Sequence, residues 1–78
     1  MAKNIHVRKK DPRPRFGATL ALLRKEMGLS QEQLALDSGL ARSYLSGVER
    51  GQRNIALVNI CKLADALKID PSELLKFR

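Results

Sequence analysis

Apolar side chains along this chain recur at the spacing of an α-helix. The first run places four of them on one helical face: Phe16, Leu20, Leu23 and Met27. This run predicts a helix that starts near residues 14–16, where proline is tolerated in a first turn, and that ends at Gly28 in a left-handed cap. No stretch alternates apolar and polar residues for long enough to be a strand, so the pattern indicates an all-α fold.

Two short helices follow, with a tight turn between them. Ser30 and Gln33 have the spacing of a capping box, which predicts a helix over residues 31–38. Gly39 ends that helix, and the next helix is predicted over about residues 42–50.

The C-terminal part of the pattern predicts two more helices. One covers about residues 57–67 and carries four apolar residues on one face: Leu57, Ile60, Ala64 and Leu67. The other starts at Asp70-Pro71, because aspartate is a good capping residue and proline suits the first helical position. Cys61, a lone free thiol in a helical pattern, is expected to be a small buried side chain.

The turn at Gly39 has the chemistry that a helix-turn-helix unit requires. A small residue is needed where the two helices cross, and Ala35 supplies it. The turn also needs a residue that readily adopts positive φ, which glycine does. Such a unit holds its second helix away from the body of the domain, so that its outer face can enter the major groove of DNA.

The distribution of charge points to a polyanionic partner. The chain has 78 residues, with 15 Lys and Arg against 8 Asp and Glu, and a formal charge of +7. Residues 1–15 hold six of the basic side chains and one acid. We therefore expect a flexible basic arm over residues 1–13 and a helix-turn-helix domain over residues 14–78. The phosphate contacts expected of the arm are Arg8, Lys9 and Lys10. A solvated tail that serves solubility is the alternative.

Several short segments agree at fixed spacing with one known family of DNA-binding proteins. They are Gly28-Leu29-Ser30-Gln31, Leu34-Ala35, Ser38-Gly39-Leu40, Arg42-Ser43-Tyr44-Leu45-Ser46, Val48-Glu49-Arg50-Gly51 and Arg53-Asn54. In these positions the chain resembles the Cro/C1-type repressors, also called the XRE family. The resemblance covers about residues 16–75 and implies a five-helix, lambda-repressor-like fold. The short chain and the stretch from Arg53 to Leu67 are most similar to restriction–modification controller proteins.

The resemblance also implies roles for single side chains. Gln31 matches a glutamine that contacts a phosphate and braces the reading helix, which is the helix predicted over residues 42–50. The positions that face base edges are Arg42, Ser43 and Gly47. The positions that reach the backbone or the adjacent groove are Arg50 and Arg53. An ion pair that ties the first helix to the third is matched by Arg24 and Glu49.

The chemistry of these side chains explains how they could contact bases. The planar guanidinium of Arg42 suits the two acceptors of guanine, a contact that discriminates between bases by about 1–3 kcal/mol. Ser46, on the same exposed face one turn further on, is a second expected contact. Gly47 has no side chain to read with, so it either lets the helix approach DNA closely or leaves that base unread. The alternative for the arginines is that they are ordinary solvated side chains.

A two-fold arrangement would double the contacts of one reading helix, so we expect a homodimer. The apolar residues left over for its interface are Ile55, Val58, Leu75 and Phe77. Phe77 is hard to bury in so small a domain, and exposed aromatic side chains mark contact sites. The alternative is that Phe77 folds back onto its own core.

The sequence shows no enzyme chemistry. Metal-ligand spacing is absent, the five glycines are predicted to be turn and cap residues, and the only histidine is His6 in the arm. We expect sequence-specific binding of double-stranded DNA by a cytoplasmic transcriptional regulator, with no cofactor, metal, small-molecule ligand or membrane association. The alternative is a protein-interaction adaptor or antitoxin that uses the helix-turn-helix as a scaffold.

Overall fold

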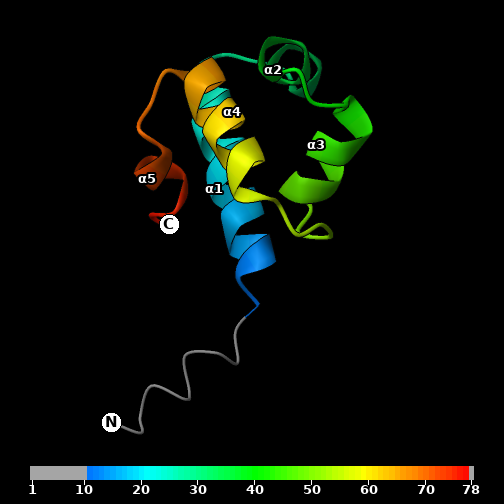
Figure 1. The fold of residues 1–78 in the computed structure, drawn as a ribbon, viewed down its shortest axis with the longest axis vertical. Helices are drawn as coiled ribbons and strands as arrows, with labels where there is room; N and C mark the ends of the chain where they lie inside the picture. Colours follow the sequence, from blue (N-terminus) through cyan, green and yellow to red (C-terminus); the bar gives the residue numbers. More distant parts are fainter. Residues whose placement is uncertain (1–10, 78) are drawn as a thin grey trace, which may run out of the picture.

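The computed structural model describes residues 11–77, and within them every regular element is a helix. The five helices are α1 (Pro12–Glu26), α2 (Gln31–Ser38), α3 (Arg42–Glu49), α4 (Leu57–Leu67) and α5 (Pro71–Leu74). Figure 1 shows α1 and α4 in the middle of the molecule, with α3 on one side and α5 on the other. The predicted all-α fold is confirmed, and α2 to α5 lie within about one residue of their predicted bounds.

A single hydrophobic core joins all five helices. Each helix contributes a leucine that is fully buried: Leu20, Leu34, Leu45, Leu63 and Leu74. Burying a leucine side chain stabilises a fold by about 1.5–3 kcal/mol relative to leaving it exposed. Because the same core holds the inner faces of α2 and α3, the helix-turn-helix unit is fixed to the rest of the domain.

The first helix starts earlier than the sequence analysis predicted. α1 begins at Pro12, and Asp11 caps it by accepting a hydrogen bond of 3.0 Å from the backbone N–H of Arg13. The Arg13 side chain also donates to the Asp11 carboxylate, and these hydrogen bonds lower the pKa of Asp11 to about 2. Asp11-Pro12 is the same start signal as Asp70-Pro71, where Asp70 accepts from the backbone N–H of Ser72 at 2.9 Å.

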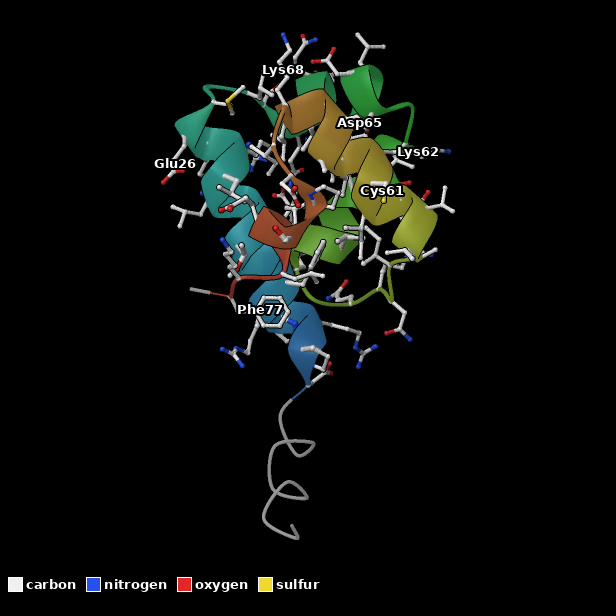
Figure 2. The ribbon with its side chains drawn as sticks, turned by 60° about the vertical axis from the view of Figure 1, so that its left-hand side comes forward. Glu26, Cys61, Lys62, Asp65, Lys68 and Phe77 are labelled. Atoms are coloured by element: carbon white, nitrogen blue, oxygen red, sulfur yellow. The ribbon has the colours of Figure 1, made fainter. Side chains whose placement is uncertain are left out.

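Three apolar residues that were expected to be buried lie on the surface instead. Met27 is 47% exposed because it is the C-cap of α1, where the chain leaves the helical face. Leu57 is 70% exposed because it is the first residue of α4, ahead of the turn that packs on the core. Cys61 is also exposed, and Figure 2 shows it beside Lys62 and Asp65 on the outer side of α4.

The caps of the short helices agree only partly with expectation. Ser30 accepts from the backbone N–H of Gln33 at 3.0 Å, but the Gln33 side chain donates to Asp37 rather than back to Ser30. The capping box is therefore half formed. Ala41 and Ala56 cap α3 and α4 without any side-chain hydrogen bond.

Two glycines allow α1 and the end of α3 to approach each other closely. A Cβ on Gly17 would lie 2.5 Å from the carbonyl oxygen of Glu49 and closer still to that of Val48. Gly51, with a φ of 76°, packs on Pro14 of α1. The sequence analysis treated all glycines as turn or cap residues, which is wrong for Gly17 within α1 and for Gly47 within α3.

None of the helices within residues 11–77 is long and apolar enough to cross a membrane.

Candidate nucleic-acid interface

The turn between α2 and α3 sets the direction of α3. Gly39 adopts a φ of 78°, as predicted, and its N–H donates to the carbonyl oxygen of Ala35 at 2.9 Å. The N–H of Leu40 donates to the same oxygen at 3.1 Å. These bonds close the end of α2 in a left-handed cap, and the half-buried Leu40 then packs against the core. The chain therefore enters α3 in one fixed direction.

One side of α3 packs on the domain, and the other side is open. Leu45 and Val48 are buried, while Arg42 and Ser43 at the start of the helix are exposed. Ser46, one turn after Arg42, is half-buried. In Figure 1, α3 lies at the edge of the molecule. The first turn of α3 is thus the part that a large partner can reach.

A buried ion pair fastens the other end of α3. The Nε of Arg24 donates to Glu49 Oε2 at 2.7 Å, and its Nη2 donates to Oε1 at 3.0 Å. Arg24 also donates from Nη1 to the carbonyl oxygen of Leu29 at 2.7 Å. The pair between α1 and α3 that the resemblance implied is therefore present. It lies among buried side chains, where both partners have their hydrogen bonds satisfied.

Gln31 joins the same cluster. Its Nε2 donates to Glu49 Oε1 at 2.8 Å, so the first residue of α2 is bonded to the last residue of α3. This contact is the bracing role that the resemblance implied. The phosphate contact implied for Gln31 stays a prediction.

Gly47 lies one turn after Ser43 on the same face of α3, and the role toward base edges expected of this position stays a prediction. It is buried, and the side chain of Arg53 covers it. Arg53 itself is exposed, as is Arg50, which follows the last residue of α3. The surface at this end of α3 therefore belongs to Arg53 rather than to Gly47.

The residues expected in a dimer interface fall into two groups. Val58 and Leu75 are exposed apolar side chains, whereas Ile55 and Phe77 are half-buried and pack against the core. The expectation that Phe77 is a free surface residue is wrong, because Phe77 folds back beside the start of α1 (Figure 2). There the guanidinium carbon of Arg15 lies 5.0 Å from the centre of its ring. Ile55, Leu75 and Phe77 line one open hollow of about 160 Å³.

The phosphate contacts expected of the basic arm lie outside the part of the chain that the structure describes. Arg8, Lys9 and Lys10 of the basic arm lie outside residues 11–77. Within those residues, no group of three or more His, Cys, Asp and Glu side chains lies close enough to hold a metal ion.

Three features define a helix-turn-helix protein here. They are a short helix held by its inner face, a tight glycine turn before that helix, and exposed arginines at its start and just after its end. The helix-turn-helix family model matches residues 20–74 of the chain. The protein therefore belongs to this family, and within it to the Cro/C1 type that the sequence resembled.

Known proteins of this family resemble the chain over most of its length. Control protein C.MunI of a Mycoplasma species is 48% identical over 65 residues, which cover 82% of this chain and 88% of the relative. The crystal structure of the restriction–modification controller protein C.AhdI from Aeromonas hydrophila has a TM-score of 0.81 and 60% identity, and the match covers 83% of this chain and 98% of that one. The biofilm regulator SinR, crystallised in complex with DNA, has a TM-score of 0.75 and 34% identity, with coverage of 78% and 98%.

Proposed function

We propose that this protein is a transcriptional regulator that binds double-stranded DNA at specific sequences, with α3 in the major groove. The observation that carries the proposal is the position of Arg42. It lies exposed in the first turn of a helix whose inner face is buried and whose far end is held by Glu49. A guanidinium presented from a rigid helix can make a bidentate contact with guanine.

The charge around α3 supports the same function. Residues 42–56 contain three arginines and one acid, and that acid is Glu49, which is paired with Arg24. Arg42, Arg50 and Arg53 are all exposed. A surface with unpaired cations and no unpaired carboxylate attracts a phosphate backbone. Gln31, Ser43 and Ser46 are proposed as further DNA contacts on the same side of the unit.

The assembly that we propose is a homodimer. Val58 and Leu75 are exposed apolar side chains, and Leu75 lines one hollow together with Ile55 and Phe77. A second copy that covers this surface would remove apolar area from water and place two reading helices about one or more helical turns of DNA apart.

The relatives suggest the biological setting. C.MunI and C.BamHI are named as control proteins, and C.AhdI is named as a restriction–modification controller. We infer that this chain controls transcription in the same manner, without an enzymatic step of its own and in the cytoplasm. No observation within residues 11–77 favours the adaptor or antitoxin alternative over DNA binding.

Selection of bound sites from random DNA at physiological salt tests this function. We expect one defined sequence with two-fold symmetry to emerge for the unmodified protein. Arg42→Ala should then reduce discrimination at one base position of each half-site by roughly tenfold, since one bidentate contact with guanine is lost.

Lys68→Gln is the matched control, because it removes one exposed positive charge at the end of α4. This variant should keep the selected sequence and its discrimination. Selection of random sequence by the unmodified protein would refute DNA reading altogether. An unchanged preference in Arg42→Ala would show that α3 is not the reading helix.

A further inference from the structure

The burial of Gly47 depends on one side chain from outside its own helix. A Cβ built on Gly47 would lie 2.9 Å from Cγ of Arg53, 3.5 Å from its Nε and 3.7 Å from its Cδ. Outside the local backbone and the two neighbouring residues, the three nearest heavy atoms to that position all belong to Arg53, so this side chain occupies the space beside the glycine. The aliphatic part of Arg53 therefore lies directly across the backbone of α3.

The charged end of the same side chain has a partner of its own. The guanidinium carbon of Arg53 lies 5.6 Å from the centre of the Tyr44 ring, within the range of a cation–π interaction. The Tyr44 hydroxyl in turn accepts a hydrogen bond of 3.2 Å from Nδ2 of Asn59, which lies on α4. Tyr44 belongs to α3, and a hydrogen bond from α4 thus holds its ring beneath the guanidinium.

A glycine at this position needs a physical reason. Gly47 lies in the interior of a helix of eight residues whose N-cap, Ala41, makes no side-chain hydrogen bond. Glycine is unfavourable within a helix relative to alanine, and a short helix without a side-chain cap has little stability to spare. Its φ is not in the left-handed region, so the backbone of α3 does not require glycine there. What does require it is the path of Arg53.

We propose that Tyr44 and Gly47 are positioning residues that form a seat for Arg53 and hold it beside α3 before DNA arrives. The inference rests on the proposed function and deepens it. A free arginine side chain loses much rotamer freedom when it binds, and a side chain already held in place loses less. Gly47 then contributes to DNA binding through Arg53 and not by touching the duplex itself.

The seat is testable in the free protein, without DNA. The side-chain Nε–Hε group of Arg53 gives its own NMR signal, which the Tyr44 ring shifts and whose relaxation reports side-chain order. Tyr44→Leu and Gly47→Ala should each move this signal to the position of a solvated arginine and lower its order. Tyr44→Phe retains the ring and should retain most of the shift. An unaltered signal in Tyr44→Leu would refute the seat, whether or not the protein binds DNA.

The contribution to binding is tested by a double-mutant cycle on a selected site. Arg53→Ala and Gly47→Ala should each weaken binding by about tenfold. The double variant should be no more than about twofold weaker than Arg53→Ala, because both changes remove the same interaction. Effects that multiply would show that Gly47 meets DNA by itself and would overturn the proposal.

Stability separates this result from misfolding. Alanine favours a helix over glycine, and the side chain that it would displace is flexible, so Gly47→Ala should keep or raise the melting temperature. Should that variant unfold, Tyr44→Leu takes its place in the cycle with the same expected outcome. If the unmodified protein selects no DNA sequence, the proposed function fails, while the NMR comparison still decides on the seat.

Discussion

Among single residues, Glu49 connects α3 to two other helices through hydrogen bonds. Its two carboxylate oxygens accept hydrogen bonds from Nε and Nη2 of Arg24 and from Nε2 of Gln31. The group is therefore fully engaged by α1 and α2 while it belongs to α3. Removing one member of a buried ion pair leaves the other charged and without a counterion, which costs more than the pair itself contributes.

Glu49→Ala is expected to lower the free energy of unfolding by about 3–5 kcal/mol, because Arg24 would stay buried and unpaired. Urea unfolding followed by circular dichroism measures the change. The control is Glu73→Ala, which removes an exposed ion pair of 3.0 Å to Lys76 and should cost no more than about 1 kcal/mol. Equal losses in the two variants would contradict the role given to Glu49.

The sequence predicted the individual site residues unevenly, for a physical reason. Arg42 and the pair of Arg24 with Glu49 could be placed because their positions follow from helical spacing and from the family resemblance. The cover over Gly47 could not be predicted, because it depends on where a loop residue, Arg53, returns to α3. No local pattern reports such a contact between a helix and a following loop. The contact of Tyr44 with Arg53 could not be predicted for the same reason.

At the scale of helices, the backbones of α1 and the end of α3 approach each other closely. Gly17 faces the carbonyl groups of Val48 and Glu49, and these atoms belong to a backbone that the core holds in place. The angle between the two helices therefore depends on the absence of a side chain at Gly17.

Gly17→Ala should destabilise the protein by about 1–3 kcal/mol, even though alanine is the better helix former, because a methyl group would meet backbone atoms that have no room to move. Thermal unfolding of the variant provides the measurement. Gly47→Ala is the matched comparison, since there the methyl group would meet only a flexible side chain. A melting temperature for Gly17→Ala as high as that of Gly47→Ala would rule out the close contact.

Helix bounds were predictable where a capping signal stands in the sequence. Ser30, Gly39 and Asp70 each mark an end that the structure places where the pattern put it. Leu57 and Met27 were not predictable from periodicity, because at helix ends the spacing continues after the packing surface has stopped. α1 was assigned a late start because charge and proline in residues 1–13 were taken as signs of an arm, although Asp11-Pro12 is itself a start signal.

At the scale of the whole molecule, the apolar surface around α4 and α5 sets the expected assembly. Val58→Glu should weaken self-association at least about tenfold, because a buried carboxylate at the interface would have no counterion. Sedimentation equilibrium of the protein without DNA gives the dissociation constant. Val58 is 64% exposed, so the change is not expected to disturb the fold.

Leu36→Glu is the control for this experiment. Leu36 is 76% exposed on α2, away from the proposed interface, so its replacement should leave the dimer unchanged. Weakening by both variants to the same degree would mean that added negative charge, rather than Val58, is responsible. Dimers that persist in Val58→Glu would place the interface elsewhere.

Because Arg24 is buried, the total number of basic side chains is larger than the number that a partner can contact. The count of 15 basic side chains treats every cation alike, but Arg24 is paired with Glu49 inside the fold and is not free to contact a duplex. Counterions displaced from a duplex respond to the cations that it touches and not to the total. We therefore expect exposed side chains such as Arg42, Arg50 and Arg53 to govern the ionic-strength dependence of binding. A comparison of isoelectric points alone would misjudge it.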